Sequence, residues 1–583
     1  MGRPSGRTRH KKIKLEPIIA FKNFGFKYTV QKEPTLYDID LNIYPGQKVL
    51  IAGPSGCGKS TLASCINGLA PFSYSGEYSG SLKIKGTEAR DSDIFARSKI
   101  VGTVLQDSDA QFVGLTVAED IAFALENDVV PVDEMKKRVA ETAALVGVGT
   151  HLSHAPQDIS GGQKQRVSLA GVLVDDVDVL LFDEPLANLD PATGEAAIEL
   201  IDDIAKNSGK TVIIIEHRIE DVLHRGIDRI ILMDDGRIIA DTTPDVLLCT
   251  DFLAGCGIRE PLYISALKYA GVHLSPSMHP AHIGTLQLSR EDRIKVRDWF
   301  SHVRPYEKTQ DEEVVLFASR LNFSYSNGCK AIDDVSFVVK RGEMTAIVGR
   351  NGAGKSTLCK LICGFEKQQE GRIGVIGGDT ADMSIRERAE HVGYVMQNPN
   401  QMISKIFIRD EVGLGPMLHG RSEEETEKLV EETLDICDLG PYIDWPISAL
   451  SYGQKKRVTI ASILSMKPDI IMLDEPTAGQ DFRRYTEIME FLEKLNRAGM
   501  TVILITHDMH LMLEYCDRTL VFSDGHLIAD DSPAAVLCDT ELVKAANLKK
   551  TSLFELAKMC GIYDTKEFTD RFIEFDRERR RAQ

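Results

Sequence analysis

The sequence contains the same series of motifs twice, and this internal repeat constrains the fold more than any other feature. Four pairs of matching segments follow one another in the same order: GPSGCGKST (53–61) with GRNGAGKST (349–357), DISGGQKQRV (158–167) with ALSYGQKKRV (449–458), VLLFDEPLANLD (179–190) with IIMLDEPTAGQD (470–481), and IIIEHR (213–218) with ILITHD (503–508). A shared order of four motifs predicts two domains of one fold rather than scattered chance matches.

The spacing between equivalent residues hardly drifts along the chain. The two motif lysines, Lys59 and Lys355, are 296 residues apart, and the two glutamates, Glu184 and Glu475, are 291 apart. The segments PLYISALKYAGV (261–272) and TSLFELAKMCGI (551–562) also match, at an offset of 290. A chain of 583 residues exceeds what a single hydrophobic core organises, so we interpret the repeat as two whole domains.

The repeat also defines the expected boundaries. We predict a basic tail at 1–16, a first domain at 17–272, a connector at 273–312 and a second domain at 313–583. The connector is polar and contains prolines, as inter-domain segments often do. Its four histidines have no cysteine beside them, so we do not expect a metal site there; they are His273, His279, His282 and His302.

Composition excludes several classes of protein. A formal net charge of −18 argues against a nucleic-acid-binding surface, which needs clustered Lys and Arg. No apolar run approaches the roughly 20 residues that span a bilayer, and no apolar stretch follows the basic N-terminus as in a secretory signal. The eleven cysteines are scattered, which favours the cytoplasm. The basic segments at 3–14 and 577–581 could touch anionic lipid or nucleic acid, but solvated tails are the simpler interpretation.

Each half contains one phosphate-binding loop. GPSGCGKS and GRNGAGKS fit GxxxxGK[ST], and each lies between an apolar run and a helical segment, as this motif requires. We expect Lys59 and Lys355 to contact the β and γ phosphates, and Ser60 and Ser356 to ligate Mg²⁺. The other residues predicted to surround the phosphates are Gly53, Ser55, Gly56, Gly58, Thr61, Gly349, Asn351, Gly352, Gly354 and Thr357.

Two adjacent acids end an apolar strand in each half. Asp183 and Asp474 are expected to orient Mg²⁺, and Glu184 and Glu475 to act as general bases that polarise an attacking water. A histidine also ends the next apolar strand in each half. His217 and His507 are therefore predicted to contact the γ phosphate and the water.

Together these motifs resemble the nucleotide-binding domains of ABC proteins over nearly the whole chain. The resemblance implies an α/β fold with two tandem P-loop NTPase domains, each with a RecA-like core sheet, an antiparallel β subdomain and a helical signature subdomain. It also implies ATP and Mg²⁺ as cofactors, and an intramolecular head-to-tail pseudo-dimer that holds two ATP molecules.

The family pattern assigns further residues by position. The resemblance implies that the signature motif of one domain caps the γ phosphate held by the other, through Ser160 and Gly162 or through Ser451 and Gly453. It implies further roles in the Q-loop and at Mg²⁺ for Gln106 and Gln397, in the D-loop for Asp190 and Asp481, and in adenine stacking for Tyr28 and Tyr325.

The second signature motif differs from the first at one glycine. Tyr452 stands where the first half has Gly161, and its bulk is expected to alter backbone conformation or packing. We predict two equipped sites with unequal rates, the site that holds Lys59 and is capped by Ser451 being the slower.

The segments after the two Q-loops indicate what the hydrolysis drives. Residues 106–127 closely resemble energy-coupling factor ATPases, and 397–415 resemble them more loosely. That resemblance implies a groove for a transmembrane T component, a separate substrate-binding S component, peripheral attachment at the cytoplasmic face of the cell membrane and no nucleic-acid partner. It points to uptake of a vitamin, a thiamine precursor or cobalt.

Each half carries two adjacent acids in this region that are expected either to receive arginines of the membrane partner or simply to open a helix; they are Glu119, Asp120, Asp410 and Glu411. Two other functions remain open: the ATPase of another ABC importer subclass, and a soluble twin-domain translation factor. The second would be expected to carry a long, strongly charged helical linker, which 273–312 does not resemble.

Overall fold

The computed structural model describes residues 16–105, 111–187, 189–304, 313–326, 328–477, 480 and 482–582. The described chain divides into two compact units. Unit 1 comprises the chain up to Pro185 with Ile198–His217 and Arg225–Pro244, and unit 2 comprises Leu186–Ala197, Arg218–His224 and the chain from Asp245 onward. Three segments of the predicted first domain, 186–197, 218–224 and 245–272, therefore belong to the same unit as the second half.

Unit 1 contains two sheets. The antiparallel sheet consists of β1 (Ile19–Tyr28), β2 (Leu36–Ile43), β4 (Gly76–Ile84) and β5 (Thr87–Glu88) in the order β2-β1-β4-β5. The second sheet has the order β10-β9-β3-β8-β7-β6 and consists of β3 (Lys48–Ala52), β6 (Val101–Val104), β7 (Val179–Asp183), β8 (Thr211–Ile215), β9 (Arg229–Asp234) and β10 (Arg237–Thr242).

The pairing in this second sheet places the functional motifs. Its strands are parallel except for the edge strand β10. Every residue of β3 and β8 is buried, as expected for strands covered on both faces. Parallel strands end at one edge of a sheet, which brings the loops after β3, β7 and β8 together.

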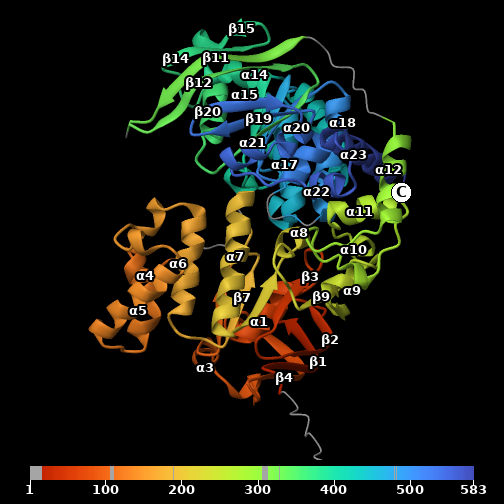
Figure 1. The fold of residues 1–583 in the computed structure, drawn as a ribbon. Helices are drawn as coiled ribbons and strands as arrows, with labels where there is room; N and C mark the ends of the chain where they lie inside the picture. Colours follow the sequence, from red (N-terminus) through yellow and green to blue (C-terminus); the bar gives the residue numbers. More distant parts are fainter. Residues whose placement is uncertain are drawn as a thin grey trace, which may run out of the picture. The chain divides into compact units, whose positions relative to one another are not determined.

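The helices of unit 1 include a separate group after the Q-loop. Helices α4, α5 and α6 pack on one another and are drawn in orange in Figure 1. The helices of this half are α1 (Lys59–Asn67), α2 (Leu69–Phe72), α3 (Ile94–Ser98), α4 (Val117–Asn127), α5 (Val132–Leu145), α6 (Gly161–Leu173) and α7 (Pro191–Ser208), the last of which begins in unit 2.

Unit 2 repeats this plan with a four-stranded antiparallel sheet, β12-β11-β14-β15, and a six-stranded sheet, β16-β17-β18-β13-β19-β20. The strands are β11 (Val314–Ser324), β12 (Lys330–Lys340), β13 (Met344–Gly349), β14 (Glu370–Val375), β15 (Gly378–Asp379), β16 (Val392–Val395), β17 (Ile470–Asp474), β18 (Thr501–Ile505), β19 (Arg518–Ser523) and β20 (His526–Asp531). The helices of its repeated part are α13 (Lys355–Cys363), α14 (Ile385–His391), α15 (Ile408–Leu418), α16 (Glu423–Ile436), α17 (Tyr452–Leu464), α18 (Phe482–Arg497) and α19 (Met509–Tyr515).

Unit 2 also contains further helices from both sequence halves. They are α8 (Ile219–Val222), α9 (Pro244–Leu247), α10 (Phe252–Gly255), α11 (Leu262–Tyr269), α12 (Arg290–His302), α20 (Pro533–Cys538), α21 (Thr540–Ala545), α22 (Ser552–Met559) and α23 (Thr565–Ala582). The matching segments 261–272 and 551–562 form α11 and α22, which pack on each other.

The stretch predicted as a connector contains helix α12, which packs against α23 within unit 2. Val296 is fully buried, and the Trp299 ring centroid lies 6.0 Å from that of Phe568 and 6.4 Å from that of Phe572. The polar composition of 273–304 did not indicate this packed helix, because only a few apolar residues on one face make the contact. The domain boundaries themselves remain predictions.

Candidate functional site

The two phosphate loops have the same backbone geometry. Each connects a buried strand, β3 or β13, to a helix, α1 or α13, and the residue before each helix, Gly58 or Gly354, has φ of 100°. A Cβ atom at Gly354 would lie 2.3 Å from the carbonyl oxygen of Ala331, so only glycine fits.

These two helices also begin in a way that suits a phosphate. Neither α1 nor α13 has a side-chain cap, and neither has an acidic residue in its first turn. Their first backbone N–H groups are therefore open to an anion, and the helix dipole favours negative charge at this end. The geometry at both loops fits the phosphates of ATP.

The motif lysines are buried and fold back over their own loops. Nζ of Lys59 donates to the carbonyls of Gly53 and Pro54 at 2.7 and 2.8 Å, and Nζ of Lys355 to those of Gly349 and Arg350 at 2.6 and 2.9 Å. Both ammonium groups are thus held at the loop, where a phosphate would be received.

A residue from the first sequence half contributes to the electrostatics of the second phosphate loop. Burial lowers the pKa of Lys355, while the carboxylates of Glu475 and Asp190 act in the opposite direction. Asp190 is buried in unit 2 and accepts a hydrogen bond from the backbone N–H of Thr193 at 2.9 Å. The structure thus brings Asp190, the predicted D-loop aspartate of the first half, into the electrostatic environment of the second phosphate loop.

Asp183 and Asp474, two of the predicted magnesium ligands, are the last residues of β7 and β17. Ser60 Oγ donates to Asp183 Oδ1 at 3.3 Å, which joins the helix start to the strand end. In the second half the hydroxyl of Tyr394 donates to Asp474 Oδ2 at 3.0 Å. Burial raises the pKa of both aspartates. A hydroxyl beside a carboxylate is a donor set that suits Mg²⁺.

The two predicted general bases share an unusual backbone conformation. Glu184 has φ of 50° and Glu475 has φ of 46°, in the left-handed region that non-glycine residues rarely adopt. Their backbone N–H groups donate to the carbonyls of Ile215 and Ile505, each at 2.9 Å, which fixes the turn that directs each carboxylate beyond its strand.

The two histidines differ in their partners. His507 Nδ1 lies 2.7 Å from Glu475 Oε1, within hydrogen-bond range. His217 Nδ1 lies 4.0 Å from Glu184 Oε1 and 3.1 Å from Oε1 of Glu216, a fully buried residue. The second half has Thr506 at that position, so the sequence itself carries this asymmetry.

The Glu475 contact has a measurable consequence for His507. Burial alone would lower the pKa of this imidazole, but the charge of Glu475 and its hydrogen bond outweigh burial, so the pKa of His507 is raised above its ordinary value. The protonated form is therefore favoured beside Glu475.

The two predicted adenine-stacking tyrosines have equivalent contacts. The Tyr28 hydroxyl lies 3.0 Å from Thr61 Oγ1, and the Tyr325 hydroxyl lies 3.1 Å from Thr357 Oγ1. Each hydroxyl thus reaches a threonine of the phosphate loop, which places the ring next to that loop. Their role in stacking stays a prediction.

The signature motifs form equivalent helix starts. Ser160 and Ser451 cap α6 and α17, each with a full capping box, and their backbone angles agree closely: φ −67° and ψ 159° against φ −65° and ψ 162°. Tyr452 therefore does not alter the backbone conformation at the cap, contrary to one of the two effects expected. Its effect lies in packing, because its hydroxyl donates to the carbonyl of Gln397 at 3.3 Å.

Among the described residues, the candidates of the first half lie in unit 1 except Asp190, and those of the second half lie in unit 2. Gln106 and Asp481 lie outside the described residues. Sequence reasoning missed Glu216, Tyr394 and Lys456. The difference between EHR and THD could have indicated Glu216, and that between GQKQR and GQKKR could have indicated Lys456, whereas Tyr394 carries no motif signal.

The acids after the Q-loops have structural partners. Asp120 accepts hydrogen bonds from the backbone N–H groups of Val113 and Gly114, at 2.9 and 3.2 Å. Glu411, only 5% exposed, accepts from those of Ser404 and Lys405, at 2.8 and 2.7 Å. Of the two alternatives for these acids, the structure favours a role within the chain for Glu411, because its carboxylate holds its own loop.

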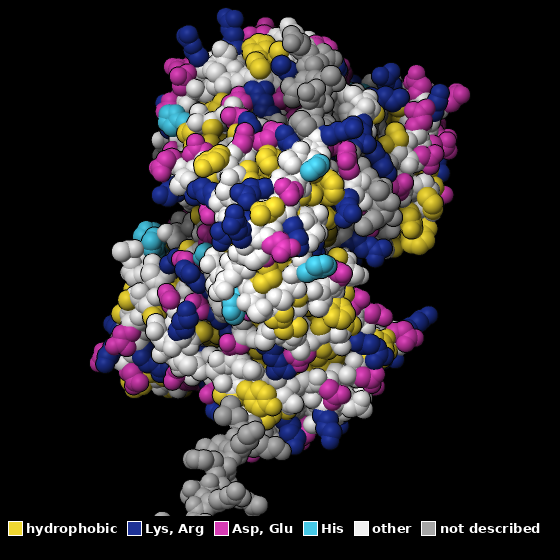
Figure 2. Space-filling model, turned by 45° about the vertical axis from the view of Figure 1, so that its right-hand side comes forward, with side chains coloured by type: hydrophobic (Ala, Val, Ile, Leu, Met, Phe, Trp, Pro, Cys, Tyr) yellow, Lys and Arg dark blue, Asp and Glu magenta, His cyan; other side chains and the backbone are white. Residues whose placement is uncertain are grey.

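Two aliphatic residues in the same loops are strongly exposed instead. Leu115 is 81% and Ile406 72% exposed, and each follows its Q-loop glutamine by nine residues. Val113, 63% exposed, and Phe407, 45% exposed, lie in the same two loops, so each loop presents two exposed apolar side chains, as a binding surface would. Elsewhere the visible face carries intermingled acidic and basic side chains with small hydrophobic patches (Figure 2).

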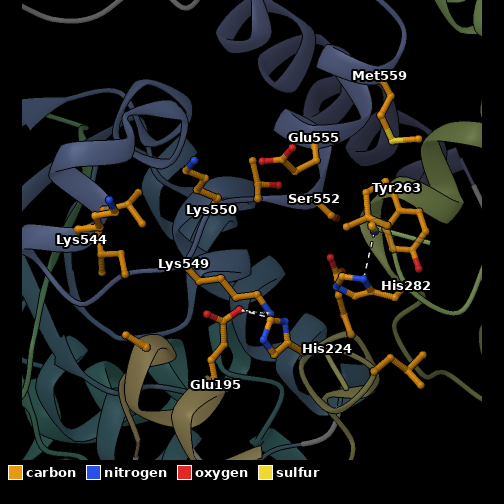
Figure 3. A pocket seen from close by; sticks show the side chains of 18 of the residues that line it. Glu195, His224, Tyr263, His282, Lys544, Lys549, Lys550, Ser552, Glu555 and Met559 are labelled. Atoms are coloured by element: carbon orange, nitrogen blue, oxygen red, sulfur yellow. Dashed lines mark hydrogen bonds and ion pairs between the residues drawn. The ribbon is translucent and has the colours of Figure 1, made fainter. Parts of the chain in front are cut away.

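Unit 2 also contains a cavity of about 800 Å³ away from the phosphate loops. Figure 3 shows Glu195 and His224 near Lys549 on one side, and His282 and Tyr263 on another. Lys549 Nζ lies 3.3 Å from Glu195 Oε1. Within the described residues no group of three or more His, Cys, Asp or Glu is placed to hold a metal ion.

Comparison with known proteins places these sites in a family. A family described as "ABC transporter" matches residues 36–187 and 332–478. A second, described as "ATP-binding cassette cobalt transporter", matches residues 250–323.

The similar proteins are named as ABC transporter ATP-binding proteins. One from Clostridium perfringens is 56% identical over 97% of this chain and 99% of its own length. Another from Enterococcus faecalis is 54% identical over 97% of this chain and 99% of its own length. A solved structure of cbiO1 from Clostridium perfringens, titled as part of the ABC transporter complex cbiONQ, is 35% identical, covers 42% of this chain and 100% of its own, and has a TM-score of 0.38.

Proposed function

Because the chain belongs to the family of ABC transporter ATP-binding proteins, we propose that it is the ATP-hydrolysing motor subunit of an energy-coupling factor type importer. It is an ATPase with tandem ABC domains, and its predicted α/β fold class is confirmed. The proposal adds its membrane partners, an integral T component and a substrate-binding S component, and its cargo, a vitamin, a thiamine precursor or cobalt.

The observation that carries this proposal is the pair of exposed residues Leu115 and Ile406. They lie in the segments that resemble energy-coupling factor ATPases, and each loop is held in shape by an acid bonded to its backbone. A coupling helix of a membrane protein would bury an aliphatic side chain in each half. The similarity of residues 250–323 to a cobalt transporter family supports the same class.

The attachment to the membrane is proposed to be through partners. No described helix combines the length and the apolar character needed to cross a bilayer. The chain would then lie at the cytoplasmic face as a peripheral subunit.

The site residues are proposed to act as follows. The open N–H groups of α1 and α13, with Lys59 and Lys355, bind and neutralise the phosphates. Glu184 and Glu475 accept the proton of the attacking water, each from a left-handed turn that holds its carboxylate beyond the strand.

Ser60 with Asp183, and Ser356 with Asp474, would hold Mg²⁺, which stabilises charge on the β and γ phosphates. His507, with its raised pKa, donates toward Glu475 and orients that carboxylate. Closure of the two domains around ATP as a head-to-tail pseudo-dimer and their reopening after hydrolysis would move the docked membrane helices.

Affinity purification from solubilised native membranes tests the proposal. The tagged chain should recover an integral membrane protein together with a small substrate-binding one, both identified by mass spectrometry. The double variant L115D/I406D should lose both while it retains ATP hydrolysis as an isolated chain. V129D is the matched control, because Val129 is 87% exposed and lies between α4 and α5. Ribosomal proteins without membrane partners would contradict the proposal.

A further inference from the structure

The second half contains a bridge between its signature helix and its Q-loop. Lys456, in the second turn of α17, is 1% exposed, and its Nζ donates to the carbonyl of Gln397 at 2.7 Å and to that of Glu475 at 3.2 Å. The hydroxyl of Tyr452, one turn earlier on the same helix, donates to the same Gln397 carbonyl at 3.3 Å.

The three joined segments belong to different parts of the ATPase. Gln397 follows β16 as the predicted Q-loop residue, Glu475 follows β17 as the predicted general base, and α17 begins at the signature motif. One buried ammonium therefore contacts the backbone of both the Q-loop and the base. The bonds go to main-chain carbonyls, so they restrain loop position whatever the side chains of Gln397 and Glu475 bind.

The bridge is held by strong interactions. A buried ammonium costs free energy unless it is hydrogen-bonded or paired with opposite charge. Burial lowers the pKa of Lys456 to about 8, while the carboxylates of Glu475 and Asp474 attract the ammonium and act in the opposite direction. The two carbonyls supply its hydrogen bonds. Displacement of α17 from the Q-loop would break the hydrogen bonds of Lys456 to these carbonyls, so the three segments favour moving together.

The first half has different residues at both positions. Gly161 replaces the tyrosine and has no side chain to reach the Q-loop. Gln165 replaces the lysine; it is neutral and shorter, and it donates to the carbonyl of Pro185. The charged bridge is therefore a property of the second half alone.

We propose that Lys456, assisted by Tyr452, is a positioning residue for ATP hydrolysis at the site that holds Lys355. It acts by holding the signature helix, the Q-loop and the backbone of Glu475 as one piece. The proposal rests on the ATPase activity of the family and not on the importer subclass, and it gives Tyr452 a role in its own half.

Steady-state ATP hydrolysis by the full chain in the E184Q background, which leaves the site of Lys355 and Glu475, tests this inference. K456Q, which introduces the residue of the first half, should lower kcat about tenfold, equivalent to about 1.4 kcal/mol of barrier, with KM for ATP changed less than twofold. K456R should restore most of the activity, and Y452G should lower kcat by about two- to threefold. K455Q is the matched control, since it removes a neighbouring positive charge on the same helix.

Hydrogen exchange separates positioning from general loss of structure. In K456Q the amides of residues 397–402 should exchange faster, while those of β17 and β18 keep their protection. If K456Q matches K455Q in kcat, or if exchange rises evenly across unit 2 together with a fall in melting temperature, the bridge has no positioning role and the inference is wrong. Loss of membrane partners would leave this result unchanged.

Discussion

Exchange of one buried residue should make the two ATP sites more alike. In the first half the imidazole of His217 lies 3.1 Å from Glu216 and 4.0 Å from Glu184, whereas His507 lies 2.7 Å from Glu475. The variant E216T introduces the residue that the second half has at this position. It removes the competing carboxylate and should let His217 approach Glu184.

The size of the effect follows from the bond that forms. A hydrogen bond to a charged group contributes about 1.5–3 kcal/mol, and each 1.4 kcal/mol realised in the transition state is tenfold in rate. Because only part of this energy orients the base during reaction, we expect turnover at the first site to rise about three- to tenfold. KM for ATP should stay within twofold, since the phosphate loop is untouched.

ATP turnover in two backgrounds provides the assay. With E475Q the first site alone is equipped, and E216T should raise its rate; with E184Q the same substitution should change the rate less than twofold. The histidine tautomers and ring position can be followed by ¹⁵N NMR of the labelled imidazoles. A fall in turnover at the first site, or an equal change in both backgrounds, would show that Glu216 does not hold His217 away from Glu184.

Three further predictions concern stability and metal dependence. E514Q should destabilise unit 2 by about 3–5 kcal/mol. Glu514 is buried 2.9 Å from Arg259, and the substitution would leave the positive charge of Arg259 without this partner. Urea unfolding measures the change in the free energy of unfolding. Burial raises the pKa of Asp570 to about 6, so ionisation of this carboxyl lowers the stability of the folded chain as pH rises from about 4 to 6. The free energy of unfolding of D570N should therefore exceed that of the parent chain by about 1 kcal/mol more at pH 7.5 than at pH 5. Paired thermal melts at the two pH values measure this difference. EDTA should abolish ATP hydrolysis, and added Mg²⁺ should restore it. In S356A the restoration should require a higher Mg²⁺ concentration, while the Kd for ADP without metal should change less than about threefold.

The motif residues could be placed from sequence because their surroundings are local. A glycine-rich loop between an apolar strand and a helix determines where Lys59 and Ser60 lie, and two acids after a strand determine where Glu184 lies. The duplication then transfers each placement to the second half.

Other features depend on contacts between segments far apart in the sequence. A lysine in a helix ordinarily indicates a solvated face, yet Lys456 is buried because α17 packs on β16 and the residue after β17 lies within its reach. Glu411 resembles an ordinary helix-opening acid, but the loop at 404–405 folds over it. Asp190 belongs to unit 2 through tertiary contacts that no periodic pattern records.

The most direct test of the central claim is ATP hydrolysis by the complex purified with its membrane partners, compared with the isolated chain. We expect the complex to hydrolyse ATP several-fold faster than the chain alone. L115D/I406D should abolish this stimulation while V129D preserves it, and E184Q/E475Q should eliminate turnover in both. Equal rates with and without membrane partners, or stimulation by ribosomes instead, would contradict the assignment of this chain as the motor of an importer.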